Sequence, residues 1–250
     1  MKLRVLGSLL LLAAAVMISC SKDKDQPLNT LVLKMRQGII PGDDTVYIVK
    51  YDAGSRITSI IDSVYADTLK VEYNSTGKVI SVQDEGWEPA TFTYNDAGQL
   101  TEIFYEAGEY SERYVFEYTN GVLSKKSEYS KTNANSPALN LWRYHTYVVT
   151  NGNITNMKEY DAAGGLLGET TFTYSAYPNA FKPLSLLNAR NTLGLGDLAN
   201  HETYFNNNLI SSSSVEGVQT TFAYTYASGE RLAQFVSSSP YAIYTRMFSY

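Results

Sequence analysis

The chain of 250 residues is 44% apolar and only 18% charged, and an apolar share this large argues against a disordered polypeptide. Its formal net charge of −5 argues against nucleic-acid binding, which needs a basic surface. Tyrosine is unusually frequent, with 21 residues, whereas cysteine occurs once. A chain of this length can form one all-β domain.

Residues 1–19 have the composition of a secretory signal peptide. Lys2 and Arg4 precede an apolar run over 6–18, which is too short for a comfortable transmembrane helix. The run ends in Met17-Ile18-Ser19-Cys20, which resembles a bacterial lipobox. This resemblance implies that Cys20 is acylated and becomes the mature N-terminus. The alternative is an ordinary signal peptide with an incidental cysteine.

Residues 20–30 are predicted to be the lipidated N-terminus and a polar linker. Ser21, directly after the cysteine, resembles the corresponding residue of lipoproteins that are sent to the outer membrane. Lys22-Asp23-Lys24-Asp25 resembles the short charged signal of Bacteroidota lipoproteins displayed on the cell surface, although a solvated tether is the alternative. We therefore expect a lipid anchor in the outer membrane, with possible surface exposure. Beyond Cys20 the chain has no thiol, so the core must stabilise the fold without disulfides.

Residues 31–250 are predicted to form a single domain built from a repeated β-hairpin. Each repeat has an apolar residue, any residue, a tyrosine, a short turn with glycine, and then an aliphatic residue. The first repeat runs from Val49 through Tyr51 and Gly54 to Ile57. The same pattern recurs around Tyr73, Tyr94, Tyr118, Tyr174 and Tyr226, although the turn after Tyr174 is broken. A period of about 22 residues suits two strands of about seven or eight residues with two connections.

The turns have residues that favour specific backbone conformations. Asn120-Gly121 and Asn151-Gly152 suit two-residue type I′ turns, which need positive φ at both positions. Asp52-Ala53-Gly54 and Asp96-Ala97-Gly98 suit slightly longer loops with glycine in the left-handed region. In Asn206-Asn207-Asn208, asparagine is predicted to replace the turn glycine. These signals predict an all-β fold, an antiparallel up-and-down meander of about 14–16 strands that is curled or barrel-like.

Period-2 alternation predicts one dry and one wet face for this sheet. The residues two positions before the repeat tyrosines are predicted to face inward: Val49, Val71, Phe92, Phe116, Phe172 and Tyr224. The residues between them and the tyrosines are predicted to face outward: Lys50, Glu72, Thr93, Glu117, Thr173 and Thr225. A circular barrel of about sixteen strands would have a lumen too wide for side chains to fill. We therefore expect the sheet to flatten or to be plugged by Phe181–Ala199, which has helix-like composition; an irregular covering loop is the alternative.

The tyrosine-and-glycine turns resemble the Tyr-Asp repeats of large bacterial Rhs-type shells. The lipobox, the short chain and the degenerate repeats more closely resemble an uncharacterised family of Bacteroidota lipoproteins with a porin-like β fold. The resemblance covers residues 31–250. It implies a curled antiparallel meander, and it provides no functional residue that could be assigned to this chain.

Sequence motifs for catalysis and metal binding are missing. The chain has no Gly-x-Ser-x-Gly elbow, phosphate loop, dinucleotide fingerprint or His-Glu-x-x-His motif. His145 and His201 are interpreted as ordinary strand or loop residues, because the pair His201-Glu202 provides too few ligands for zinc. Asp43-Asp44 lacks the spaced oxygen ligands of a calcium loop. We therefore expect no metal and no cofactor, and we do not expect an enzyme.

Acidic and aromatic residues could nevertheless form a binding or hydrolytic site. Glu85 and Glu88 flank a tryptophan, and two carboxylates across a cleft are what a glycosidase needs. Further acids gather in the next hairpin: Glu102, Glu106, Glu109 and Glu112. A solvated sheet face is the alternative for both groups. Aromatic residues outside the repeat are predicted ligand contacts: Trp87, Trp142, Tyr177 and Tyr241. The repeat tyrosines are interpreted as hairpin caps, with a packed ring and a hydroxyl that reaches water or backbone.

Together these features predict a non-enzymatic, lipid-anchored envelope protein with a binding or structural role at the outer membrane. Its expected partners are the membrane, through the N-terminal lipid, and a glycan or an envelope protein. One alternative is an envelope glycan hydrolase. The other is an integral outer-membrane barrel, because Phe248-Ser249-Tyr250 resembles the end of a closing strand. The polar residues on the outward face argue against a lipid-facing apolar band.

Overall fold

A computed structural model of the protein describes residues 30–36, 44–63, 65–106, 111–131, 138–187, 201–227, 231–241 and 243–247. The predictions for the signal peptide, for Cys20, for the charged linker and for the last three residues fall outside these ranges. Among the described residues, no helix is long and apolar enough to cross a membrane.

The described residues form one antiparallel sheet of sixteen strands, in which each strand pairs with the next along the chain. The strands are β1 (Thr30–Arg36), β2 (Asp44–Tyr51), β3 (Ile57–Asp62), β4 (Thr68–Tyr73), β5 (Val79–Asp84), β6 (Ala90–Tyr94), β7 (Leu100–Tyr105), β8 (Glu112–Thr119), β9 (Val122–Ser130), β10 (Asn140–Thr150), β11 (Asn153–Asp161), β12 (Leu166–Pro178), β13 (Asn208–Val215), β14 (Val218–Ala227), β15 (Arg231–Ser238) and β16 (Ile243–Met247). The predicted up-and-down meander is confirmed.

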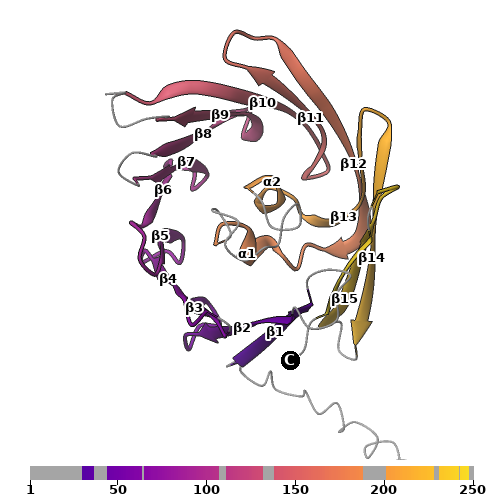
Figure 1. The fold of residues 1–250 in the computed structure, drawn as a ribbon. Helices are drawn as coiled ribbons and strands as arrows, with labels where there is room; N and C mark the ends of the chain where they lie inside the picture. Colours follow the sequence, from indigo (N-terminus) through magenta and orange to yellow (C-terminus); the bar gives the residue numbers. More distant parts are fainter. Residues whose placement is uncertain are drawn as a thin grey trace, which may run out of the picture.

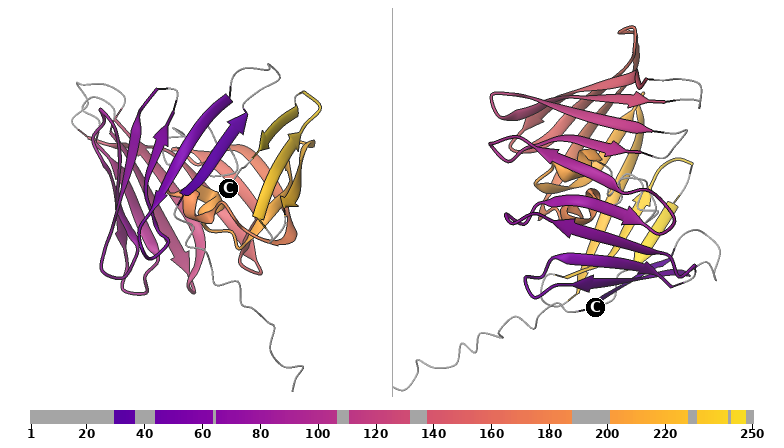
Figure 2. Two further views of the ribbon diagram at one scale, coloured as in Figure 1. Left: turned by 90° about the horizontal axis from the view of Figure 1, so that it is seen from below. Right: turned by 90° about the vertical axis from the view of Figure 1, so that its left-hand side faces the viewer.

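The sheet curls into a wall around a central space (Figure 1), and its strands are inclined to one another around that space (Figure 2). The two edge strands, β1 and β16, come close to each other. Within the described ranges, however, no ladder of backbone hydrogen bonds joins them. The sheet is therefore barrel-like in shape but open in its hydrogen bonding.

A β-bulge at an equivalent place in successive hairpins sets which residues face inward. Between Glu72 and Tyr73 the pairing with β5 shifts by one residue and leaves Ile80 without a partner in β4. The same shift immediately precedes the tyrosine in other hairpins, at Tyr51, Tyr94, Tyr118 and Tyr226. Because the extra residue interrupts the alternation once, the buried residues at the start of β5, Val79 and Val82, are three positions apart.

Two of the predicted turns have the expected backbone. Asn120-Gly121 has φ values of 52° and 78°, and Asn151-Gly152 has values of 52° and 74°, which confirms type I′ geometry. Glu216-Gly217, between β13 and β14, has the same pattern, with φ values of 50° and 81°. The sequence analysis missed this third turn because glutamate is not a residue typical of a left-handed position.

The prediction for Asp52-Ala53-Gly54 was wrong in detail. Ser55, with φ of 61°, occupies the left-handed region instead of Gly54. The Asp52 carboxylate explains the difference, because its Oδ1 accepts hydrogen bonds from the backbone N–H groups of Gly54 and Arg56, both at 2.9 Å. The side chain thereby holds the loop in an arrangement that needs the positive φ one residue later. In the other predicted loop, Gly98 has the expected positive φ of 78°.

The predicted dry face is the inner face of the sheet. Val49, Val71, Phe92 and Phe116 are buried, and Phe172 and Tyr224 are half-buried. The residues predicted to face outward are all exposed: Lys50, Glu72, Thr93, Glu117, Thr173 and Thr225. The apolar core therefore lies inside the curled sheet, and the charged side chains of these strands face water.

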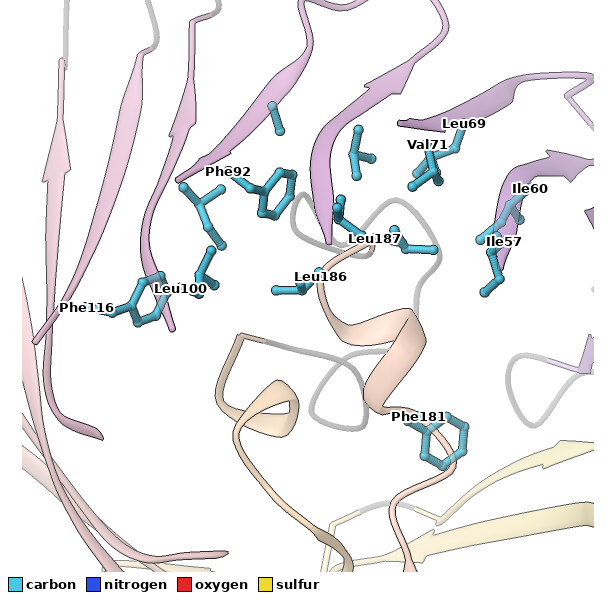
Figure 3. Close-up of a cluster of buried hydrophobic side chains, with 14 of the residues drawn as sticks. Ile57, Ile60, Leu69, Val71, Phe92, Leu100, Phe116, Phe181, Leu186 and Leu187 are labelled. Carbon is cyan, nitrogen blue, oxygen red and sulfur yellow. The ribbon is translucent and has the colours of Figure 1, made fainter. Parts of the chain in front are cut away.

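The connection between β12 and β13 enters the central space and fills part of it (Figure 1). It contains two short helices, α1 (Lys182–Ser185) and α2 (His201–Tyr204), and its described residues are called the plug below. Phe181, Leu186 and Leu187 around α1 join the same buried cluster as the inward side chains of the strands (Figure 3). The predicted plug is thus confirmed over the described residues 181–187, whereas 188–199 fall outside them. Helix α2 was not predicted.

Candidate binding site in the interior

A cavity of about 140 Å³ lies between the inner faces of β11–β14 and helix α2. Its lining consists of Ile154, Met157, Thr170, Phe172, Tyr174, Glu202, Asn206, Ile210, Ser213, Val215 and Phe222. Most of these side chains are apolar or aromatic. The polar groups come from α2 and the segment after it, at Glu202 and Asn206, and from the strands, at Thr170 and Ser213. Such an apolar pocket with a few convergent polar groups is the usual form of a small-molecule site.

The strand register explains how the cavity is walled and where it opens. Phe172 pairs with Ser213 across β12 and β13, and Thr170 pairs with Val215 two positions further along. All four line the cavity, so they project from the inner face. Val215 is 47% exposed, although its partner Thr170 is 9% exposed. The cavity therefore opens at Val215, beside the β13–β14 turn, and α2 lies at its closed end.

Asparagine side chains attach α2 to the wall. The amide Nδ2 of Asn179 donates to the backbone carbonyl of Thr203 at 2.8 Å. Oδ1 of Asn206 accepts the backbone N–H of Ile154 at 2.8 Å. Asn206-Asn207-Asn208 was predicted to be a hairpin turn, and this was wrong: the segment leads from α2 into β13. Asparagine occurs here because its side chain can pair with backbone groups that the irregular plug leaves without strand partners.

Five charged side chains, Lys126, Glu128, Arg143, Glu159 and Glu202, form the interior charged cluster. The Lys126 ammonium forms ion pairs with Glu128, at 2.9 Å, and with Glu202 on α2. Arg143 joins Glu128 at 2.7 Å and Glu159 at 2.8 Å. The side chains of Lys126 and Glu128 are only 6% and 5% exposed. The Glu202 side chain is 14% exposed, so the largely buried Lys126–Glu202 ion pair connects the wall of the sheet to α2.

Burial and pairing fix the charge of the cluster. Burial alone would raise the pKa of Glu202, but the nearby Lys126 ammonium outweighs it and holds that pKa well below its ordinary range. Burial likewise opposes the charged form of Lys126, yet Glu202 and Glu128 raise its pKa. At neutral pH the cluster thus holds three carboxylates against two cations, a net charge of −1.

Both histidines are neutral neighbours of this cluster at pH 7. Burial, together with the charge of Lys126, lowers the pKa of His201 to about 4. Burial also lowers the pKa of His145, which belongs to β10. Nδ1 of His145 lies 3.4 Å from Oε1 of Glu128. Within the described part of the chain, no group of three or more His, Cys, Asp or Glu side chains could hold a metal ion.

Glu202 connects the charged cluster to the cavity. Its Oε1 accepts hydrogen bonds from the Lys126 ammonium and from the Tyr147 hydroxyl, the latter at 3.0 Å. These are the hydrogen bonds to this carboxylate among the described residues, and both go to Oε1. Since Glu202 also lines the cavity, its carboxylate can accept a further hydrogen bond from a guest. The site is therefore suited to binding a donor or a cation.

The aromatic residues predicted as ligand contacts are exposed but do not form one site. Trp87 and Trp142 are each 57% exposed, Tyr177 is 52% exposed and Tyr241 is 82% exposed. Trp87, Trp142 and Tyr241 lie at or near connections on one end of the sheet, whereas Tyr177 precedes the plug at the other end. Tyr177 packs on Tyr226, with ring centroids 4.5 Å apart. None of the four predicted contacts lines the cavity.

The acids proposed for hydrolysis also lie elsewhere. Glu85 and Glu88 are exposed in the turn between β5 and β6, and they take no part in the cavity. In the next hairpin, Glu102 is paired with Arg113 at 2.6 Å. These acids are therefore better described as part of a solvated surface than as residues that face each other across a cleft.

Sequence reasoning missed Lys126, although the repeats contain a signal for it. The third residue after the aliphatic residue of each turn faces inward because of the bulge. Other hairpins have Ile60, Val82 and Ile103 at this position, and β9 has Lys126. A lysine in an otherwise apolar register marks a buried charge that needs a partner. Alignment of the repeats on their bulges would have revealed it.

No known protein-family model matches this chain. No curated protein is similar to it in sequence at a significant level. Solved structures share its fold. A porin-like protein from Bacteroides uniformis ATCC 8492 has a TM-score of 0.58 and 15% identity, covering 89% of this chain and 96% of its own. A porin-like protein from Bacteroides vulgatus ATCC 8482 has a TM-score of 0.55 and 14% identity, covering 87% and 98%. The porin-like β fold implied by the sequence resemblance is confirmed.

Proposed function

We propose that this chain is a non-enzymatic, lipid-anchored envelope protein with a binding role at the outer membrane. The distribution of side chains across the sheet carries this proposal. Membrane-spanning barrels present an apolar band outward. Here the outward residues of the repeat are charged or polar, as at Lys50, Glu72 and Glu117, and its apolar residues face inward. This orientation supports a water-exposed body rather than the integral barrel considered as an alternative.

The position of the acidic residues supports a role in binding over one in hydrolysis. Two catalytic carboxylates would have to face each other across an accessible cleft. Glu85 and Glu88 instead lie in an exposed turn. In the interior, Glu128 and Glu202 are engaged by the same lysine, Lys126. The exposed Trp87, Trp142 and Tyr241 are separate aromatic side chains, each of which suits contact with a glycan or an envelope protein.

The N-terminal sequence supports the anchor and the location. Met17-Ile18-Ser19-Cys20 resembles a lipobox, and Ser21 resembles the residue of lipoproteins sent to the outer membrane. Lys22-Asp23-Lys24-Asp25 supports display on the cell surface. Several lipid chains on Cys20 would hold the body stably at the bilayer, because each buried methylene contributes about 0.8 kcal/mol.

The test separates a lipid anchor from membrane insertion. Cells that express the wild-type chain should incorporate radiolabelled palmitate into it, and the Cys20→Ser variant should remain unlabelled. A second variant replaces residues 1–20 by an ordinary cleavable signal peptide, so that the body is exported without lipid. We expect the wild type in the outer-membrane fraction and this second variant in the soluble fraction. An unlabelled wild type, or a lipid-free body that still needs detergent for extraction, would contradict the proposal.

A further inference from the structure

The cavity between β11–β14 and α2 has a closed end that is acidic and an open end that is apolar. Glu202 lies at the closed end, and half-exposed Val215 lies at the opening. We propose that this cavity binds a small organic cation, a protonated amine on a compact hydrocarbon body, with the ammonium group at Glu202. This deepens the proposed binding role, because it names the class of ligand.

The size and lining of the cavity determine which hydrocarbon body the ligand can have. A cavity of about 140 Å³ is close in volume to the roughly 150 Å³ engineered cavity that accepts benzene. Ile154, Met157 and Ile210 provide aliphatic and thioether surface along the walls. Phe172 and Phe222 provide aromatic surface that packs against an apolar body. A single six-membered ring or a short branched chain would fill the space.

The electrostatics of the closed end favour a positive charge. The interior charged cluster has an excess of one negative charge, since Lys126 and Arg143 together face Glu128, Glu159 and Glu202. A buried carboxylate without full compensation is costly in a medium of low dielectric constant. The Glu202 carboxylate lines the cavity, and its Oε1 accepts hydrogen bonds from Lys126 and Tyr147. An ammonium group that donates to this carboxylate would complete the compensation, and an anionic guest would be repelled.

Three probes of the same shape test this assignment on the mature protein purified in detergent. Benzylamine carries the charge, benzyl alcohol is its neutral counterpart, and benzoate reverses the sign. Titration calorimetry at pH 7 should show benzylamine binding at least about tenfold more tightly than benzyl alcohol, with no binding of benzoate. Equal affinity for the amine and the alcohol, or no binding of benzylamine at millimolar concentration, would overturn the proposal.

Two variants locate the binding. Glu202→Gln should remove the preference for the amine while the cavity remains. Val215→Trp should block the opening and abolish binding of both benzylamine and benzyl alcohol; because Val215 is half-exposed, this change leaves the core intact. Ile80→Trp, a comparable enlargement on the outer surface of β5, is the matched control and should leave binding unchanged. Binding that survives Val215→Trp would place the amine elsewhere and overturn the assignment, even if Glu202→Gln fails to fold. Membrane attachment is measured separately in cells. The proposed lipid anchor and the proposed amine site can therefore each fail without the other.

Discussion

At the scale of single residues, the repeat tyrosines satisfy backbone carbonyls where adjacent hairpins separate. The ladder between β5 and β6 covers only two residue pairs, and beyond it the Tyr94 hydroxyl donates to the carbonyl of Val79 at 2.9 Å. Equivalent bonds of 2.5–2.8 Å join Tyr73 to Ile57, Tyr118 to Leu100 and Tyr174 to Ile154. In the last repeat, Tyr224, two residues before Tyr226, makes the corresponding bond to the carbonyl of Ile210. Because a buried carbonyl needs a partner, the tyrosine takes the place of a missing backbone donor. The interpretation as hairpin caps is confirmed at Tyr73, Tyr94, Tyr118 and Tyr174.

Removal of one such hydroxyl tests this role. Tyr94→Phe keeps the ring and leaves the carbonyl of Val79 without its donor, so we expect a loss of about 0.5–1.5 kcal/mol in the free energy of unfolding. Tyr65→Phe is the matched control, because Tyr65 is 74% exposed, and it should change stability by less than about 0.5 kcal/mol. Urea denaturation measures both. Indistinguishable effects would mean that the bond contributes nothing.

Inward and outward positions of one strand should respond differently to truncation. Phe92 is 5% exposed, and Phe92→Ala should lower the free energy of unfolding by about 3–5 kcal/mol. Thr93 is exposed, and Thr93→Ala should lower it by well under about 1 kcal/mol. Phe172 borders the cavity and is only half-buried, so Phe172→Ala should be milder than Phe92→Ala. Chemical denaturation measures the free energy of unfolding of the three variants. Small effects in all three would contradict the predicted order.

At the scale of elements, α2 depends on the charge that it meets inside the sheet. Lys126→Met would leave Glu202 and Glu128 buried without their shared cation, and we expect a loss of about 3–5 kcal/mol in stability. Lys125→Met is the matched control, since the neighbouring Lys125 faces outward and pairs with exposed Glu117; it should lose less than about 1 kcal/mol.

The double variant Lys126→Met/Glu202→Gln isolates the pair. It should be less destabilised than the sum of its single variants, because the second change removes a charge that the first leaves uncompensated. Strict additivity in urea denaturation would show that the two side chains do not interact.

The buried histidine of α2 should make the protein sensitive to acid. The pKa of His201 falls to about 4 in the folded state, mainly because of burial, against about 6.5 when unfolded. The unfolded state therefore binds more protons below pH 6.5, so stability falls as pH falls from there toward 4. The depressed pKa of Glu202 acts in the same direction at lower pH.

This histidine should account for about 2 kcal/mol of the stability lost between pH 7.5 and 5. His201→Phe should reduce the decline by that amount, because the new ring can occupy the site between Tyr114 and Phe116. Denaturation curves at both pH values test this. A variant that loses as much stability as the wild type would place the acid sensitivity elsewhere, for example at His145.

The hairpins were predictable from the sequence, whereas α2 was not, because the two depend on different ranges of interaction. Turn residues such as Asn120-Gly121 and the alternation around Phe92 act over a few neighbouring residues. Helix α2 has four residues and no apolar period of its own. It is held by partners far along the chain, through the Lys126–Glu202 pair and the Asn179–Thr203 hydrogen bond. For the same reason, the cavity that α2 completes could not be foreseen.

At the scale of the whole molecule, the plug joins parts of the sheet that do not pair with each other. Leu186 and Leu187 extend toward the inward side chains of β4–β7 (Figure 3), and Leu187 is 1% exposed. On the other side, Phe181 contacts Phe235 of β15 with ring centroids 6.4 Å apart. In a meander each strand contacts mainly its neighbours. Without the plug, hairpins that are not adjacent would therefore stabilise each other only through the hairpins between them. The plug therefore couples the N-terminal and C-terminal halves of the open sheet.

This coupling predicts a long-range response to a change in the plug. Leu187→Ala removes buried methyl groups at the contact with β4–β7 and should lower stability by about 2–5 kcal/mol. Because the plug also rests on β15 through Phe181, hydrogen exchange should accelerate in β14 and β15 as well as in β4–β7. Thr225→Ala is the control: Thr225 is exposed on the outer face of β14, so its effect should remain in β14 and β15. If Leu187→Ala changed exchange only in β4–β7, the plug would fill space without connecting the two walls.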